Sequence, residues 1–365
     1  MQKGVEGRRD VSPRPGDGRG CEHDNSAMTA PSPTASNTAF ATAAASAVPE
    51  ALPSPAAADA LLDGLATLPH LGVIRAQGEE AAKFLQGQLT QDFMLIPEGH
   101  ARFAGYCSPK GRLLASFVGV RLAADDFALV VSADILAPTL KRLSMFVLRA
   151  KVKLSDATAA FEMRGLAGEA ARSALGVAAP AMPEPWTDQV QGEAHAVALY
   201  PADGVPRALW LAPAGTSAPQ AAALPDGAWV WSAVRSGVAT ITAPVVEAFV
   251  PQMLNYESVG GVNFKKGCYP GQEVVARSQF RGQIKRRAYL AQSEAPLFAG
   301  QEVFIPGDDQ PCGVLVQASS WTPRSGLAGG IVSLSAQAVT EGASFQVSGA
   351  PISLHPAPYE LLMDI

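Results

Sequence analysis

Apolar residues recur along this 365-residue chain at two different spacings. Between residues 78 and 95 they fall mostly three or four positions apart, which predicts an amphipathic helix. Residues 133–150 repeat this pattern and predict a second helix, with Ser132 or Asp134 available to cap it.

Other segments have the shorter apolar runs that are typical of strands. Residues 101–122 predict two strands joined by the turn Ser108-Pro109-Lys110-Gly111, and residues 126–132 predict a third. Strands are also predicted at 194–201 and 207–213. Helix and strand signals alternate without the regular rhythm of a doubly wound parallel sheet, so the sequence favours an α+β fold.

The sequence pattern changes after Arg287. Short β-rich runs between Gly and Pro turns, at 300–307, 312–320 and 329–335, predict a separate all-β C-terminal domain. We therefore divide the folded part into residues 61–286, with two mixed α/β subdomains, and residues 287–365.

Residues 1–60 differ in composition from the rest. Met1–Asn25 mixes five basic with five acidic residues, and Ser26–Ala58 is dominated by Ala, Ser, Thr and Pro. Neither part can bury enough apolar surface to offset its chain entropy, so we expect a disordered extension. An organelle transit peptide is the alternative, although such peptides are poor in acidic residues. Translation could also start at Met28.

Bulk charge and cysteine usage narrow the function classes. The net charge is only −5, so nucleic-acid or membrane binding would have to come from a local patch. The four cysteines form no CxxC pair and the five histidines are scattered, which argues against a disulfide framework or a metal site within the chain. With no segment long and apolar enough to span a membrane, we expect a soluble, cytoplasmic protein.

One stretch, "NFKKGCYPGQEVVAR" (263–277), has the composition of a functional loop. Gly267 and Pro270-Gly271 predict a turn on either side of Cys268, and the following residues can begin a helix. A position just before a helix N-terminus, beside Lys265 and Lys266, favours the thiolate form of a cysteine. The alternative is a cysteine buried as a small apolar residue in a tight turn.

Basic residues concentrate around this loop. Between Lys265 and Arg287 the chain carries seven basic residues and one acid, Glu273. This pattern indicates either a solvated connector between domains or a site for an anionic ligand, such as a polyglutamylated cofactor or RNA phosphates.

The segment "KGCYPGQE" (266–273) resembles the K-G-C-Y-x-G-Q-E signature of the YgfZ family of folate-binding proteins, which are relatives of the glycine-cleavage aminomethyltransferase, or T-protein. Upstream, "FLQGQLTQD" (84–92) and "CSPKGRLL" (107–114) are similar to the family's N-terminal segments, in the same order. The resemblance covers about residues 65–362.

The resemblance implies three subdomains around a central hole, two of them mixed α/β and the third a C-terminal β-barrel. It implies binding of tetrahydrofolate or a derivative. It also implies a role in assembly or repair of iron–sulfur clusters in client enzymes, including tRNA-modifying ones, without direct contact with RNA. We expect a monomer.

The resemblance also implies site residues. Cys268 takes the role of the motif cysteine, and we expect it on a bend beside a cavity wide enough for a pteridine. Cofactor-binding positions around it are Lys266, Tyr269, Gln272, Glu273 and Arg277. No resident metal ligand is expected.

Trp229 is the expected aromatic of the folate pocket. An indole face can stack on a pterin ring, although packing in the core would also explain this residue. Ala239 stands where the family has a proline, and Leu71 occupies the place of a second tryptophan found in some relatives. Cys107 is a candidate second thiol near the site.

A folate-dependent aminomethyltransferase is the alternative function. Such enzymes resemble one another in having an acidic residue in place of the loop cysteine and a glutamate-bearing segment that holds the pterin. Here the loop has Cys268, and the corresponding segment 195–210 contains no glutamate. We therefore favour an accessory assembly factor over a transferase. A pure RNA-binding protein is a third reading, but the chain lacks the motifs of common RNA modules.

Overall fold

The structure is a computed structural model that describes residues 62–280, 284–321 and 326–362. All of these residues belong to one compact unit. The extension predicted over residues 1–60 lies outside the described residues.

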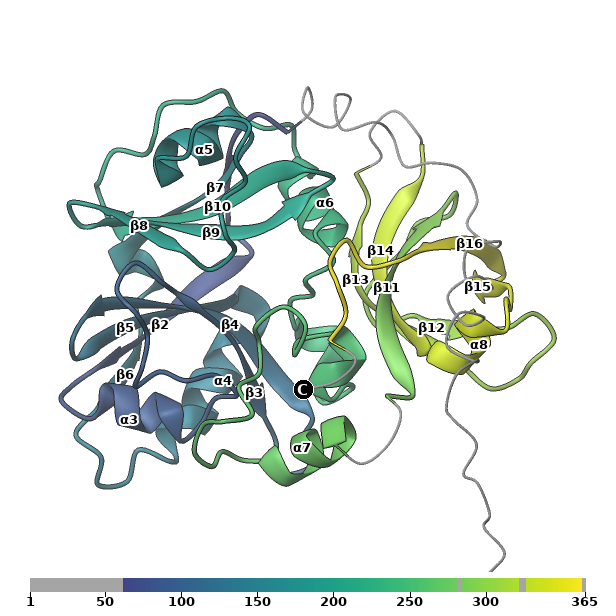
Figure 1. Cartoon of the computed structure of the whole chain (residues 1–365), viewed down its shortest axis with the longest axis horizontal. Coiled ribbons are helices and arrows are strands. Elements are labelled where there is room, and N and C mark those ends of the chain that lie inside the picture. The colour runs from purple at the N-terminus through teal and green to yellow at the C-terminus, as the bar shows by residue number, and fades with distance from the viewer. Residues whose placement is uncertain (1–61, 281–283, 322–325, 363–365) are drawn as a thin grey trace, which may run out of the picture. The chain divides into compact units, whose positions relative to one another are not determined.

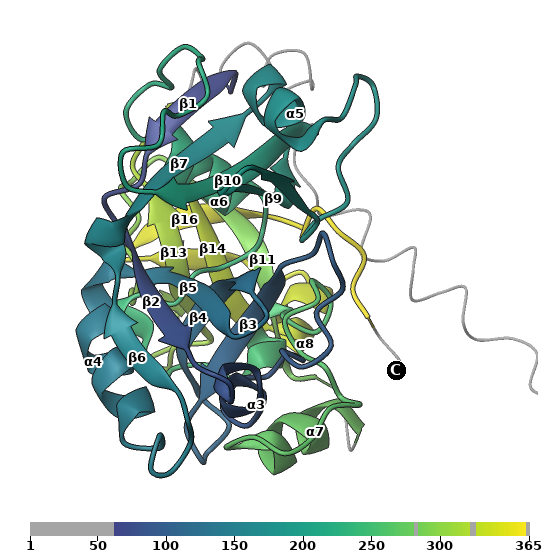
Figure 2. The same ribbon diagram turned by 90° about the vertical axis from the view of Figure 1, so that its left-hand side faces the viewer.

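The first sheet is antiparallel, and one face is covered by the helix α4 (Ala133–Ser144), as Figure 2 shows. Ile135, Leu136 and Leu143 are buried on the inner side of α4, at the spacing of a single helix face. The strands of this sheet, in spatial order, are β3 (Arg102–Cys107), β4 (Leu113–Ala123), β5 (Asp126–Ser132), β2 (Leu71–Gln77) and β6 (Lys153–Asp156).

The second sheet is also antiparallel and packs against two helices, α5 (Glu169–Leu175) and α6 (Ala228–Arg235) (Figure 1). Helix α6 contacts both β9 and two strands of the C-terminal barrel. The strands, in spatial order, are β1 (Gly64–Thr67), β7 (Phe161–Ala167), β10 (Val205–Pro213), β9 (Ala194–Ala202) and β8 (Asp188–Gln191).

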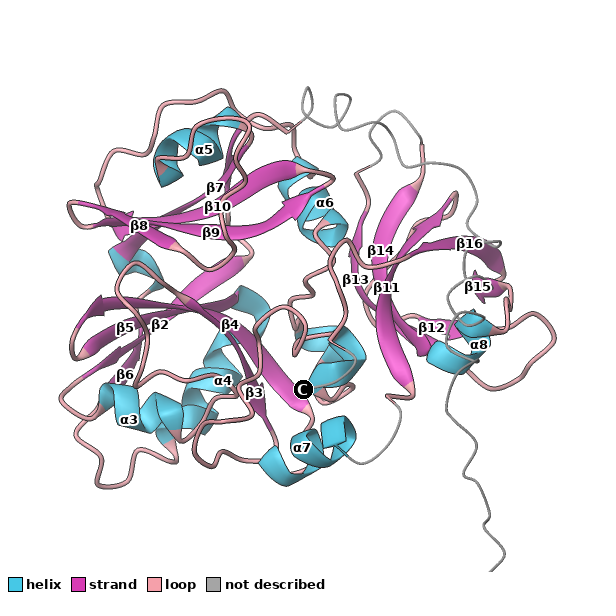
Figure 3. Ribbon diagram, viewed as in Figure 1, coloured by secondary structure: helices cyan, strands magenta, loops and turns pink. Residues whose placement is uncertain are grey.

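Six strands close a barrel at the C-terminal end of the chain (Figure 3). The first barrel strand starts at Arg286, and the short helix α8 (Ala336–Thr340) follows the fourth in sequence. Their order around the barrel is β11 (Arg286–Ser293), β14 (Ala328–Ser335), β13 (Gly313–Ser319), β12 (Glu302–Phe304), β15 (Phe345–Val347) and β16 (Ala350–His355).

Short helical segments join these layers. They are α3 (Ala81–Gln86), α7 (Gln272–Phe280) and the 3₁₀ turns η2 (Thr158–Ala160), η3 (Ala243–Val245) and η4 (Pro251–Leu254). Apolar packing is continuous between the layers, since one buried cluster joins Phe117 of β4, Phe249 before η4 and Leu290 of β11.

The α+β class and the C-terminal barrel are confirmed, and so are the strands predicted between residues 101 and 132. The helix predicted over 78–95 is wrong beyond Gln86. Leu89 instead pairs with Tyr106 in a β-bridge, and the Thr90 amide donates to the Gly105 carbonyl. Leu89 and Phe93 are buried as their spacing suggests, but from an irregular segment.

The second predicted helix is also shorter than expected, since α4 ends at Ser144 rather than at Ala150. Ser132 occupies its N-cap position without capping a backbone amide. Its hydroxyl instead donates to the Asp134 carboxylate at 2.7 Å.

Candidate functional site

Cys268 lies on the surface, in a loop of residues 263–271 that leads into α7 and that we call the cysteine loop. The chain turns at Gly271, which has φ +80°, whereas Gly267 does not have a positive φ. A Cβ atom at Gly271 would lie 2.4 Å from the Ser108 carbonyl oxygen, so only glycine fits against the β3–β4 turn. The cysteine loop is therefore packed closely against the first sheet.

Lys266 fixes this loop from the inside. Its ammonium is buried and donates to the carbonyl oxygens of Gln86 at 2.5 Å and Leu89 at 2.8 Å. It also lies 4.5 Å from the centroid of the Tyr269 ring, a cation–π contact. Burial lowers the pKa of Lys266 to about 8, against smaller opposing effects of Asp92 and Cys268. Lys265, in contrast, is exposed.

The other positions predicted around Cys268 divide between core and surface. Tyr269 is buried, and Gln272 is half-buried at the start of α7. Glu273 and Arg277 form an ion pair of 2.7 Å between exposed side chains one helical turn apart. The structure thus brings Lys266 and Tyr269 together beneath the loop and leaves Glu273 and Arg277 on the outer face of α7.

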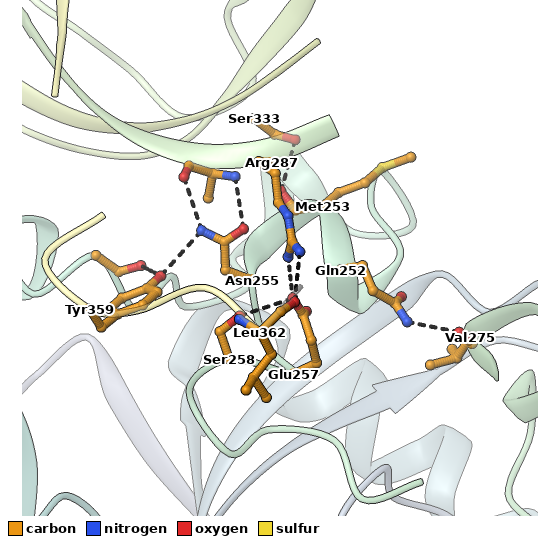
Figure 4. A network of polar contacts seen from close by, with 12 residues as sticks. Gln252, Met253, Asn255, Glu257, Ser258, Val275, Arg287, Ser333, Tyr359 and Leu362 are labelled. Carbon is orange, nitrogen blue, oxygen red and sulfur yellow. Dashed lines mark hydrogen bonds and ion pairs between the residues drawn. The ribbon is translucent and has the colours of Figure 1, made fainter. Parts of the chain in front are cut away.

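A buried polar network holds α7 and the first barrel strand in place (Figure 4). The Gln252 side chain donates to the Val275 carbonyl of α7 at 2.7 Å, and the Asn255 amide donates to the Ala288 carbonyl of β11 at 3.0 Å. Glu257 and Arg287 form a buried ion pair, and Arg287 also donates to the Leu362 carbonyl. Residues 252–257 therefore connect the α/β part to the barrel.

A cavity of about 610 Å³ lies away from the cysteine loop. Both sheets, α6 and the barrel segments 297–299 and 317–320 contribute residues to its lining. Cys268 is not among the lining residues. On the first sheet, the cavity reaches Phe103 and Ser116, whereas Gly271 of the cysteine loop packs on the β3–β4 turn at Ser108.

Aromatic rings form much of the cavity wall. Phe103 and Trp186 stack with centroids 5.0 Å apart and planes 5° apart, and Tyr200 lies 5.9 Å from Trp186. Leu71 also lines the cavity, at the position where some relatives have a second tryptophan. Trp186, from a different segment, contributes an indole to the cavity wall instead. Sequence reasoning missed Trp186, because a single tryptophan in a Pro-rich loop carries no pattern.

Trp229 lines the cavity and is only 6% exposed. Its ring packs on the backbone of Gly165, where a Cβ atom would lie 2.5 Å from the indole carbons. The guanidinium carbon of Arg207 lies 4.4 Å from the ring centroid. Trp229 is therefore both a packed residue and part of the cavity wall. Arg207, which sequence reasoning also missed, lines the same cavity.

The remaining described cysteines differ from Cys268. Cys107 is buried, and burial raises its pKa to about 12, so its thiol is unreactive at neutral pH. Cys312 is half-buried, and its sulfur donates to the Val303 carbonyl. Over the described ranges, no group of three or more His, Cys, Asp or Glu side chains is placed to hold a metal ion. Within the same ranges, no helix is long and apolar enough to span a membrane.

Two antiparallel sheets followed by a closed barrel, with a cavity lined from all three, define a protein with the aminomethyltransferase fold. Residues 63–186 match the family described as the GCVT N-terminal domain. The structure of glycine cleavage system aminomethyltransferase T from Bartonella henselae superposes with a TM-score of 0.58, covering 84% of this chain and 89% of that one. At 16% identity this similarity establishes the fold alone.

Curated relatives define the family more closely. The chain is 31% identical over 231 residues to the tRNA-modifying protein YgfZ of Edwardsiella ictaluri, a match that spans 61% of this chain and 69% of that protein. It is 31% identical over 235 residues to the YgfZ of Colwellia psychrerythraea, spanning 63% and 72%. The chain belongs to the YgfZ family, which confirms the resemblance carried by its cysteine motif.

Proposed function

We propose that this protein binds a reduced folate in the cavity and supports assembly or repair of iron–sulfur clusters in client enzymes through Cys268. The observation that carries the proposal is the exposed thiol of Cys268 on a loop fixed by the buried Lys266. An accessible sulfur held in one position can meet a client protein, whereas a buried one cannot. The relatives' name, tRNA-modifying protein, supports clients that act on tRNA.

The chemistry proposed for Cys268 is that of a soft ligand. Its thiol loses a proton to water, and the sulfur then takes the place of a water or a client thiolate, which leaves, on iron of a client's cluster, without any change of oxidation state. In this account the iron is cargo and not a resident cofactor. Lys266 positions the loop, and its ammonium interacts electrostatically with Cys268.

The cavity supports the folate part of the proposal. Its volume of about 610 Å³ falls in the range of small-molecule sites, and its wall contains Phe103, Trp186, Tyr200 and Trp229. Flat aromatic walls suit a ligand built from a pterin and an aminobenzoyl ring. Because Cys268 is not among the residues that line the cavity, a folate that acts as a bound regulator or structural ligand is favoured over one that reacts with Cys268.

One observation separates this function from an aminomethyltransferase. Transferases resemble one another in holding the pterin with a glutamate from the segment that corresponds to residues 195–210. In this chain the carboxylate of that segment is Asp203. Both of its oxygens are occupied by Arg235, at 2.6 to 3.1 Å. The deepest charged group of the cavity is instead the cation Arg207. An accessory factor fits these charges better than a transferase.

Complementation of cells that lack the protein tests the role of Cys268. Cys268→Ser replaces the soft sulfur with a hard hydroxyl of similar size and should fail to restore the activity of iron–sulfur enzymes. Cys312→Ser is the matched control, because Cys312 is also accessible in part but lies on the barrel, and it should restore activity fully. Full rescue by Cys268→Ser, at equal protein abundance, would remove the proposed role of the thiol.

A further inference from the structure

Arg207 is a buried cation that pairs with no carboxylate in the described part of the chain. It is 4% exposed, and it takes part in no ion pair with a described residue. Its guanidinium makes one hydrogen bond within the described chain, a long one of 3.3 Å from Nη1 to the Tyr200 carbonyl. Its buried Nε has no partner there. Within the described chain, the guanidinium of Arg207 therefore retains hydrogen-bond donors without a protein partner at the cavity wall.

Burial of an unpaired charge is unfavourable for folding, and it lowers the pKa of Arg207 to about 9. Arg235 shows how the same fold treats an arginine that is structural. It is 2% exposed, and Asp203 accepts hydrogen bonds from its Nε and Nη2. Of these two buried arginines, Arg235 has a carboxylate partner and Arg207, among the described residues, does not. Only Arg207 lines the cavity.

We propose that Arg207 donates a pair of hydrogen bonds to the carbonyl edge of a pterin, at its C4 oxygen. This inference rests on the proposed function, because it names the contact that selects the folate in the cavity. In a reduced pterin the adjacent N5 atom carries hydrogen or a one-carbon group, so the C4 oxygen, with its two lone pairs, is the acceptor on this edge, as the O6 oxygen of guanine is for arginine. The Trp229 ring holds the guanidinium plane in position from one side.

The depth of Arg207 decides which end of the folate it contacts. Trp229 beside it is buried, whereas the charged or polar lining residues His70 and Asp134 are exposed and mark the opening of the cavity. A glutamate tail carries two carboxylates, and one guanidinium cannot compensate the loss of hydration of both. The neutral pterin edge can be buried at Arg207 with the glutamate left near the opening.

Calorimetric titration of the full chain with two fragments tests this orientation. 6-Methyltetrahydropterin contains the proposed edge and no glutamate, and p-aminobenzoylglutamate contains the glutamate and no pterin. Arg207→Met should weaken binding of the pterin by about 10- to 100-fold and leave binding of p-aminobenzoylglutamate unchanged. Arg207→Lys keeps the charge without the two-pronged geometry and should fall between Met and the wild type. Arg164→Met, on β7 of the same sheet but outside the lining, should bind both fragments normally.

The outcomes separate this inference from the proposed function. If the wild type binds a folate and Arg207→Met binds the pterin equally well, the inference is wrong and the folate site stands. Selective loss of p-aminobenzoylglutamate, or tighter binding of guanosine than of the pterin, would also overturn it. If the wild type binds no folate, the proposed function itself fails.

The thermal stability of Arg207→Met distinguishes a structural role of Arg207 from a role in ligand binding. Removing an unpaired buried charge should leave the ligand-free melting temperature of Arg207→Met equal to or above that of the wild type. A clearly lower melting temperature together with unchanged pterin affinity would show that Arg207 serves the fold and not the ligand.

Discussion

The ammonium of Lys266 lies 2.8 Å from the carbonyl oxygen of Leu89, a residue 177 positions earlier in the chain. With the second bond to Gln86, this contact joins the segment after α3 to the cysteine loop. The same two carbonyls lie where the predicted helix would have continued, so the lysine contact and the early end of α3 occur together. Cys268 is thereby held on the surface by a buried neighbour.

The buried ammonium predicts a pH dependence of stability. The pKa of Lys266 is lowered from 10.5 to about 8 by burial, so between these values the unfolded chain binds more protons than the folded one. The free energy of unfolding should therefore rise with pH, by up to about 3 kcal/mol, relative to Lys266→Met. Above pH 8 the neutral amine still has donors for both carbonyls.

Urea denaturation of both proteins at several pH values from 7 to 10.5 measures this difference. Lys265→Met serves as the control, because Lys265 is exposed and should show no such slope. Parallel curves for the wild type and Lys266→Met would mean that the ammonium of Lys266 is hydrated in solution.

Thiol reactivity should follow burial among the three described cysteines. Iodoacetamide at neutral pH should modify Cys268 first and Cys312 more slowly, because Cys268 is exposed and Cys312 half-buried. Cys107 should remain unmodified until the chain unfolds, since burial raises its pKa to about 12. Peptide mapping by mass spectrometry at timed intervals gives the order, and early modification of Cys107 would contradict the packing of β3.

The buried pair Glu257–Arg287 should be costly to break from one side only. Arg287→Met leaves the Glu257 carboxylate buried without its partner and should lower the free energy of unfolding by about 3 to 5 kcal/mol. The double variant Glu257→Leu/Arg287→Met removes both charges and should recover most of this loss. Equal destabilisation of the single and double variants would show that shape, and not charge, determines the effect.

The sequence predicted what depends on neighbours along the chain. Short apolar runs between turns located β4, β5 and the barrel strands, and Pro270-Gly271 located the turn before α7. It did not predict the end of α3, because the carbonyl partners come from Lys266, far along the chain. The sequence predicted only some of the residues that line the cavity, for the same reason. Trp186 and Arg207 meet Phe103 and Trp229 only through packing of the two sheets, and no local spacing records that packing.

Folate binding by the cavity is the central claim, and isothermal titration of the full chain with 5-formyltetrahydrofolate tests it most directly. The wild type should bind one folate per chain. Cys268→Ser should bind equally, because Cys268 lies outside the lining. Ala233→Trp, which fills the cavity from a half-buried position on α6, should lose binding while circular dichroism shows an intact fold. Absence of binding by the wild type, or full binding by Ala233→Trp, would contradict the account.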